Sequence, residues 1–381
     1  MRKGWEYKKL GEVCDITMGQ SPDGNSINEA NGVEFHQGKT CFGERFLGVS
    51  PLYSNAPTKL AEAHSVLLCV RAPVGYPNIT DRKICIGRGL CALYAKQEID
   101  NTFLFYSLLG KQAYFEKNAT GSTFKAISSK TVSNTTLSIP PKSTQFAIVS
   151  ELDKINELIR LKKEQLKDFD NLAQSLFYEM FGDPVENEKG WEVKKIGDLA
   201  LVKTGPFGSM LHKEDYICDG IPLVNPVHMK DFKIVPDLDF TISKEKASEL
   251  ENYLLKSNDV VFARRGDIGR CAIVSEAEQG FICGTGSLFV RFSKEIESIF
   301  IMYIIRCDSF SKHLISKAKG ATMLNINSNT IADLRIPLPP LSLQRLFAQR
   351  IEQIEREKSE VQKSIQDLET LLASRMQYWF E

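Results

Sequence analysis

Two stretches of the chain carry apolar residues at alternating steps of four and three, with charged residues between them. This heptad pattern is typical of helices that pair along one side. We therefore predict two long helices, over 142–182 and 341–381, that pair antiparallel. At ~1.5 Å per residue, about 39 helical residues extend ~58 Å, which is more than one small domain needs. The residues expected on the pairing side are Ile148, Leu152, Ile155, Leu166, Phe169, Phe347, Ile351, Ile354, Val361, Ile365 and Leu368.

The first helix also carries signals at its ends. Ser143 or Thr144 can cap its start, Gly182 suits a left-handed residue after the last turn, and Pro184 prevents continuation. One lysine falls within each apolar series, Lys162 in the first helix and Lys358 in the second. We interpret both as side chains that extend from an imperfect register into solvent. The alternative is that they set the register of the pair.

The remaining segments alternate short apolar runs with glycine, asparagine and proline. The runs 65–70 and 259–262 are examples of buried strands in a mixed domain. A Pro-Pro pair closes each segment, at 140–141 and 339–340, because proline continues neither a strand nor a helix interior. We predict an α+β protein with two globular domains of mixed α/β structure, related by pseudo-twofold symmetry and separated by the two antiparallel helices. The predicted boundaries are 1–141, 142–182, 183–340 and 341–381.

The chain repeats itself, and the repeats keep one order. The offset between the copies drifts by only about a dozen residues, so we infer a duplicated unit of roughly 190 residues. The matching segments are Trp5–Val13 with Trp191–Leu199, Gly19 with Gly205, Leu68–Gly75 with Phe262–Gly269, Gly87–Gly89 with Gly284–Gly286, Gly121–Thr123 with Gly320–Thr322, and Ile139–Pro141 with Leu338–Pro340. Gln145 and Gln344 follow the last pair in the same frame.

The composition is that of a globular protein, with 43% apolar and 25% charged residues. Neither a membrane-spanning run nor a secretory leader is recognisable, so we expect a cytoplasmic location and no membrane partner. The formal net charge is zero, and affinity for nucleic acid would have to come from local patches. Residues 1–141 carry a mild excess of positive charge, with 16 Lys and Arg against 12 Asp and Glu. Nine cysteines lie singly, which favours buried reduced thiols over zinc or disulfides.

A search for catalytic motifs favours a binding protein. Asn225–His228 is not the Asn/Asp-Pro-Pro-aromatic motif of amino-methyltransferases, and Gly205–Ser209 lacks the Gly-Lys that a P-loop requires. Glu6-Tyr7-Lys8 has nuclease-like Glu-x-Lys spacing but no upstream Pro-Asp. The five histidines are not spaced as metal ligands. We read Gly87-x-Gly89 and Gly284-x-Gly286 as tight turns. The sequence therefore predicts no catalytic residue, no metal and no cofactor in this chain.

The opening Trp5–Glu12, the Gly19–Pro22 turn and the Arg71–Gly75 segment resemble the specificity subunits of type I restriction–modification systems. The Gly121–Lys125 run and the Pro-Pro boundary before a long helix share that resemblance, which covers the whole chain. The second copy departs from the pattern at 205–209 and 320–324. These departures indicate that the two copies read different bases.

The resemblance implies a function in sequence recognition. Each globular domain would be a target-recognition domain for one half of an asymmetric, bipartite site in double-stranded DNA. The paired helices would act as a spacer and recruit two modification (methyltransferase) subunits. S-adenosylmethionine would be bound by those subunits, and restriction subunits with ATP-dependent translocase and nuclease activity could join the complex.

The candidate DNA contacts are arginines beside glycines, lysines suited to phosphates, and polar or aromatic residues of the repeated turns. They are Gln20, Ser21, Lys39, Arg71, Arg88, Ser122, Thr123, Lys125, Phe207, Ser209, Arg264, Arg265, Lys319 and Thr322. For each, solvated surface charge or turn formation is the alternative. Two other functions stay open, a DNA-binding scaffold without methyltransferase partners and a nuclease with an unrecognised site.

Overall fold

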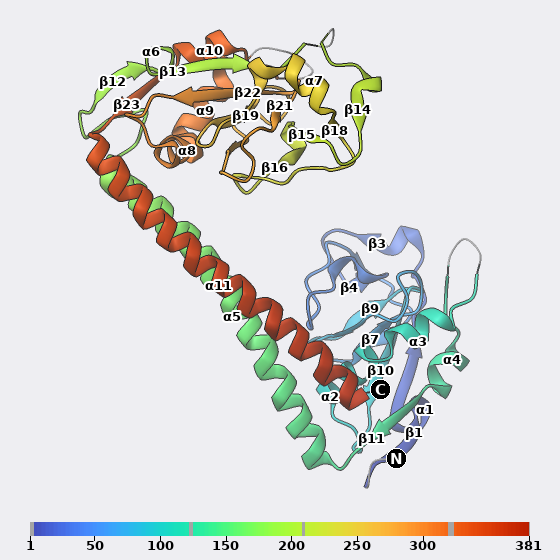
Figure 1. Cartoon of the computed structure of the whole chain (residues 1–381). Coiled ribbons are helices and arrows are strands. Elements are labelled where there is room, and N and C mark those ends of the chain that lie inside the picture. Colours follow the sequence, from blue (N-terminus) through green and yellow to red (C-terminus); the bar gives the residue numbers. More distant parts are fainter. Residues whose placement is uncertain (1–3, 122–124, 208–209, 319–323, 381) are drawn as a thin grey trace. The chain divides into compact units, whose positions relative to one another are not determined.

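The computed structural model describes residues 4–121, 125–207, 210–318 and 324–380. They form two compact units, each containing one globular part and the adjoining portions of both long helices. Unit 1 comprises Met1–Glu164 and Gln362–Glu381, and unit 2 comprises Gln165–Val361. The long helices are α5 (Lys142–Phe181) and α11 (Leu341–Phe380), shown in green and red in Figure 1. Among the described helices, none has the length and apolar character needed to cross a membrane.

The described residues of unit 1 form three sheets and four short α-helices. The first sheet pairs β1 (Glu6–Lys9) with β11 (Thr136–Ile139). The second, in the order β2-β10-β7-β8, contains β2 (Cys14–Met18), β10 (Leu90–Ala95), β7 (Val66–Cys69) and β8 (Pro77–Ile79). The third, in the order β3-β5-β4-β9-β6, contains β3 (Ile27–Asn28), β5 (Tyr53–Ser54), β4 (Val33–His36), β9 (Ile84–Ile86) and β6 (Leu60–Ala61). The helices are α1 (Leu10–Val13), α2 (Asn101–Leu109), α3 (Gln112–Lys117) and α4 (Ser129–Asn134).

Unit 2 repeats the first two of these sheets. Strands β12 (Glu192–Lys195) and β23 (Arg335–Leu338) pair, and the order β13-β22-β19-β20 joins β13 (Ala200–Thr204), β22 (Ser287–Phe292), β19 (Val260–Ala263) and β20 (Cys271–Ile273). A third sheet contains β14 (Tyr216–Ile217), β18 (Thr241–Ile242), β15 (Ile221–Val224) and β21 (Ile282–Cys283), and a fourth pairs β16 (Met229–Lys230) with β17 (Lys233–Ile234). The helices are α6 (Ile196–Leu199), α7 (Lys244–Glu249), α8 (Ser298–Arg306), α9 (Asp308–Lys317) and α10 (Ser328–Asp333).

The same polar anchor holds the junction between globular part and long helix in both units. The amide of Gln145 is fully buried, donates to the carbonyl of Pro140 at 2.9 Å and accepts from the backbone N–H of Asp100 at 2.8 Å. Gln344 donates to Pro339 at 2.8 Å and accepts from Glu297 at 3.1 Å. The repeated glutamines therefore satisfy buried backbone groups at the Pro-Pro boundary.

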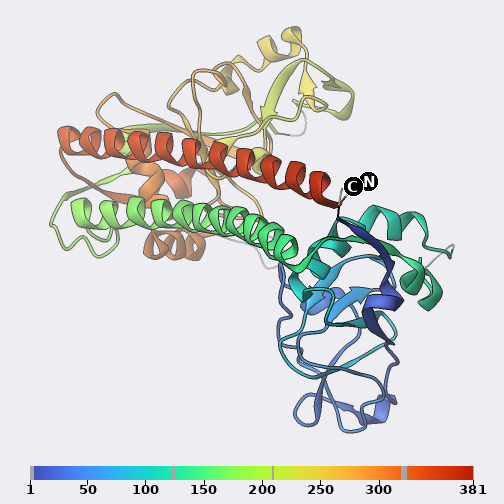
Figure 2. The ribbon, with the colours of Figure 1, turned by 90° about the horizontal axis from the view of Figure 1, so that it is seen from below.

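The two long helices run antiparallel within each unit, as Figures 1 and 2 show. In unit 1, Glu151 pairs with Arg375, and Lys163 pairs with Glu369 at 3.1 Å, so residue numbers fall along one helix as they rise along the other. In unit 2, Lys358 donates to Asp170 of the opposite helix at 2.8 Å. Lys358 was predicted to extend into solvent, but it forms an interhelical ion pair.

The start of α5 also differs from expectation. The helix begins at Lys142, and the carbonyl of Pro141 already accepts from the N–H groups of Thr144 and Gln145. Ser143 and Thr144 therefore lie inside the first turn and do not precede it. The end agrees with the prediction, because α5 stops at Phe181 and Gly182 adopts a φ of +77°.

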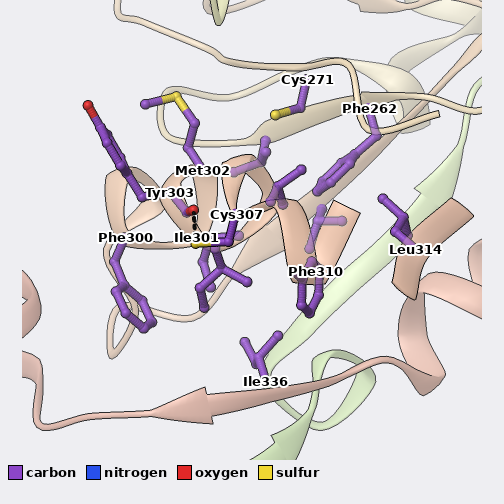
Figure 3. Packing of buried hydrophobic residues seen from close by; sticks show 14 of the residues in the cluster. Phe262, Cys271, Phe300, Ile301, Met302, Tyr303, Cys307, Phe310, Leu314 and Ile336 are labelled. Atoms are coloured by element: carbon purple, nitrogen blue, oxygen red, sulfur yellow. Dashed lines mark hydrogen bonds between the residues drawn. The ribbon is translucent and has the colours of Figure 1, made fainter. Parts of the chain in front are cut away.

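The first turns of each long helix belong to the core of the adjoining globular part. Ile148 and Leu152 pack in the unit 1 core, and Phe347 and Ile351 pack in the unit 2 core. Figure 3 shows part of the unit 2 core, where apolar side chains of α8 and α9 meet those of β19, β20 and β23. The heptad residues near each helix start therefore anchor the helix to its globular part.

Candidate nucleic-acid interface

In unit 1, three strand ends carry polar side chains to one place. Gln37 follows β4, Arg71 lies two residues after β7, and Arg88 lies in the turn between β9 and β10. Backbone hydrogen bonds join these ends, from Gly87 to His36 at 2.7 Å and from Val70 to Gly89 at 2.9 Å. Together they border a pocket of about 120 Å³, lined by Gln37, Gly38, Lys39, Arg71, Ala72, Arg88 and Gly89. The structure thus brings together Lys39, Arg71 and Arg88, which the sequence predicted separately.

The pocket is electropositive. Lys39, Arg71 and Arg88 are all exposed, and the ammonium of Lys39 lies 3.4 Å from the centroid of the Tyr76 ring. Within the described part of the chain, none of these three cations forms a salt bridge, whereas nearby Arg82 is bound by Glu34 and Asp81. Cations without neighbouring carboxylates attract phosphate groups. The pocket therefore suits the DNA backbone.

Of the other unit 1 candidates, Gln20 and Lys125 form backbone hydrogen bonds next to this pocket, and two others lie outside the described residues. The N–H of Gln20 donates to Ile86 at 3.0 Å, and the carbonyl of Lys125 accepts from Ala72 at 3.1 Å. The hydroxyl of Ser21 is buried and has no hydrogen-bond partner among the described residues. Ser122 and Thr123 lie outside the described residues.

Unit 2 places its candidates on the corresponding strand ends. Asn225 follows β15, Arg264 follows β19, and the Gly284–Gly286 turn follows β21. Arg264 N–H donates to Gly286 at 3.0 Å, as Val70 does to Gly89 in unit 1. The guanidinium carbon of Arg264 lies 5.7 Å from the ring centroid of Phe207, which is 58% exposed. Arg265 is exposed, and Ser209, Lys319 and Thr322 lie outside the described residues.

Paired glycines allow the chain that follows β2 and β13 to approach the turn. A Cβ on Gly19 would lie 2.1 Å from the carbonyl oxygen of Gly87, and one on Gly205 would lie 2.0 Å from that of Gly284. The predicted turns are confirmed by hydrogen bonds from Leu90 to Gly87 and from Ser287 to Gly284. The glycines thus serve a close backbone contact that positions Ser21 and Phe207 beside the strand ends.

Two residues of the interface were missed from the sequence. Gln37 and Asn225 occupy equivalent places, one residue after the strands that pair parallel with β9 and β21. Amide side chains can bind the adenine edge in the major groove with two hydrogen bonds. In this structure the amide oxygen of Asn225 instead accepts from the N–H of Gly286 at 3.2 Å. The sequence did not indicate these two residues because they are of different types and follow strands of unlike sequence. The spacing between the two copies also changes in this region.

The described residues contain no group of three or more His, Cys, Asp or Glu placed to hold a metal ion. All nine cysteines are free, and seven are buried. Burial raises the pKa of the Cys14, Cys69 and Cys271 thiols to about 12, which disfavours the nucleophilic thiolate at neutral pH. Cys218 is exposed, and Cys41 is partly exposed.

Comparison with known proteins identifies the family of the chain. The model of the type I restriction modification DNA specificity domain matches residues 2–168 and, a second time, residues 188–370. The chain belongs to this family. The two matches also confirm the internal duplication, since each specificity domain contains one globular part and the first portion of a long helix.

Individual relatives agree with this assignment. The putative type I restriction enzyme MjaX specificity subunit of Methanocaldococcus jannaschii is 38% identical over 45% of this chain, which matches only 41% of that protein's length. The MjaIX specificity subunit of the same organism is 23% identical over 91% of this chain and 85% of its own length. The solved S subunit of a type I system from M. genitalium has the same fold, with a TM-score of 0.55, 15% identity and coverage of 99% and 96% of the two chains.

Proposed function

We propose that this specificity subunit reads a bipartite, asymmetric site in double-stranded DNA and performs no chemistry itself. One observation carries the proposal: equivalent strand ends in the two units bear cations and amides, yet the side chains differ. Ser21, Gln37 and Val70 of unit 1 are replaced by Phe207, Asn225 and Arg264 at the equivalent places of unit 2. The cation at Arg71, by contrast, recurs as Arg265. Unlike side chains at equivalent places favour two unlike half-sites.

The paired helices supply the second half of the proposal. They recruit two methyltransferase subunits, which bind S-adenosylmethionine, and ATP-dependent restriction subunits can join the complex. Apolar side chains on the outside of the pair support this role. In unit 1, Leu158 and Leu161 of α5 are each 47% exposed, and Leu371 of α11 is 46% exposed. A contiguous apolar patch marks a surface that binds a protein partner, and Leu158 and Leu161 are neighbours one turn apart on α5.

Methylation mapping of cells with and without this gene tests the proposal directly. We expect one bipartite motif to lose methylation when the gene is removed. Metal-dependent DNA cleavage by the purified chain alone would favour the nuclease alternative. A purified chain that binds a specific site but never co-purifies with a methyltransferase would favour the scaffold alternative.

Removing the unit 1 cations is expected to weaken binding to every DNA sequence alike. The test is a triple variant, Lys39→Ala, Arg71→Ala, Arg88→Ala. Each lost phosphate contact should make the plot of log affinity against log salt concentration less steep by ~0.9, so the slope should change by about 3 in total. Titration of labelled duplex at several salt concentrations measures this slope. The matched control removes three exposed lysines on β1, α4 and α5, Lys9, Lys130 and Lys154. Equal slopes for the two variants would contradict the phosphate role.

Lengthening the helix pair is expected to widen the gap between the half-sites. Four residues inserted within Leu158–Leu172 of α5, with four in the facing part of α11, add ~6 Å of helix. At ~3.4 Å per base pair the preferred gap grows by roughly one or two base pairs. Methylation mapping of the variant complex reads the gap. An unchanged gap at full methylation would exclude the helices as the spacer.

A further inference from the structure

Arg264 is a charged residue of unit 2 whose burial the described contacts do not explain. Its side chain is 7% exposed, and its buried Nε has no hydrogen-bond partner among the described residues. Burial lowers the pKa of Arg264, and the charge of neighbouring Arg265 lowers it further. Arg291 of unit 2, by contrast, is paired with Asp259 at 2.6 Å. A guanidinium nitrogen that is buried without an acceptor is unfavourable, so a ligand that supplies acceptors to this guanidinium would compensate for its burial.

Unit 1 shows what a purely structural residue looks like at this place. Val70 makes the same backbone hydrogen bonds as Arg264. The N–H of each residue donates to the glycine turn of its unit. The carbonyl of Val70 accepts from Ile127, and that of Arg264 accepts from Ile326, at 2.9 Å in each case. Val70 is 3% exposed and apolar. The fold therefore accepts valine here, and the arginine is not needed for packing.

The residue beside Arg264 differs between the units as well. Counted from Gly19 and Gly205, Ser21 of unit 1 corresponds to Phe207 of unit 2. The Phe207 ring lies against the Arg264 guanidinium, at 5.7 Å from ring centroid to carbon. A small pair, Ser21 and Val70, is thus replaced by a large pair in contact. A ring against a guanidinium restricts the plane in which its N–H groups point.

Neutralising a phosphate requires no such restriction. Arg265 is exposed and occupies the place that Arg71 has in unit 1. Its side chain can bind a DNA phosphate without being held in one orientation. A guanidinium of fixed plane instead suits a rigid pair of acceptors, and guanine offers O6 and N7 in the major groove. Adenine presents a donor and an acceptor on that edge, which a guanidinium cannot match.

From this geometry, and resting on the proposed function, we infer that Arg264, oriented by Phe207, reads one guanine in the half-site bound by unit 2. The corresponding pair in unit 1, Val70 and Ser21, makes no such contact. Arg264 is therefore a specificity-determining residue, and Phe207 is its positioning residue.

Selection from a randomised duplex library tests the inference. The full chain with its methyltransferase partner is isolated through a tag on this chain, and bound DNA is sequenced for wild type, Arg264→Val, Arg264→Lys and Phe207→Ser. We expect Arg264→Val to lose a guanine preference of about 10- to 100-fold at one position of one half-site and to leave the other half-site unchanged. Phe207→Ser should weaken the same preference in part. Arg264→Lys should keep affinity better than valine but lose the bidentate preference.

Arg265→Ala is the matched control and is expected to weaken binding to all sequences alike. Thermal melting of Arg264→Val should show a midpoint no lower than wild type, because valine occupies this place in unit 1. An unchanged motif, or an even loss across all sequences, would overturn the assignment of Arg264 to guanine. If wild type itself enriches no bipartite motif, the proposed function fails and this inference fails with it.

Discussion

Replacing Leu158 and Leu161 together with glutamate is expected to release the methyltransferase subunits that we propose dock there, while leaving the fold intact. The two side chains lie one turn apart on α5 and are nearly half exposed, so glutamate meets water in the free chain. In a complex that covers this surface, both carboxylates would lose solvent without gaining a partner. Burying an unpaired charge costs several kcal/mol, so we expect affinity for the partner to fall at least ~100-fold.

Co-purification through a tag on this chain measures that loss. The control is Lys154→Glu, an exposed charge change on the same helix. Helical content from circular dichroism should match wild type in both variants. Stoichiometric methyltransferase bound to the double glutamate variant would show that this part of the helix pair is not the docking surface.

Phe177→Ala is expected to lower the free energy of unfolding of unit 2 by about 3–5 kcal/mol. Phe177 is 1% exposed and lies at the centre of the unit 2 core. Its ring centroid is 5.2 Å from that of Phe181, 5.9 Å from Phe300 and 5.6 Å from Phe347, so one side chain joins α5, α8 and α11. No nearby side chain on three rigid helices can fill the resulting cavity without moving backbone.

Urea unfolding of the full chain, followed by tryptophan fluorescence and circular dichroism, measures this effect. The control is Phe146→Ala, also on α5 but 55% exposed, for which we expect a change below about 0.5 kcal/mol. A loss below ~1 kcal/mol for Phe177→Ala would contradict the central role of this ring.

The sequence predicted best what depends on local pattern. Heptad spacing and the Pro-Pro pairs gave helices that agree with the observed Lys142–Phe181 and Leu341–Phe380 to within one residue at each end. The paired glycines marked a real close contact. Ser143 and Thr144 were misjudged as caps because the carbonyl of Pro141 starts the helix earlier, which composition does not reveal. The interhelical partner of Lys358 depends on the register between distant segments, which heptads alone leave open.

The candidate interface was predicted in part. Lys39, Arg71 and Arg88 were named as separate residues, but only the meeting of three strand ends places them around one pocket. Gln37 and Asn225 were missed because their place is defined by parallel strand pairing rather than by a motif. The burial of Arg264 could not be predicted either, because the sequence identifies an arginine but not how exposed its side chain is.

The packing of α11 has a consequence for synthesis. Phe380 lies in the unit 1 core, 5.6 Å from the ring of Phe103, and Leu372, Met376 and Trp379 pack beside it. These residues leave the ribosome after all of unit 2, although N-terminal domains usually fold first. Unit 1 therefore keeps an uncovered apolar surface until this part of α11, which is made after unit 2, packs against it. Any shortened translation product lacking residues 372–380 would expose that surface, which chaperones and proteases recognise, so the cell would remove incomplete chains before they could occupy DNA.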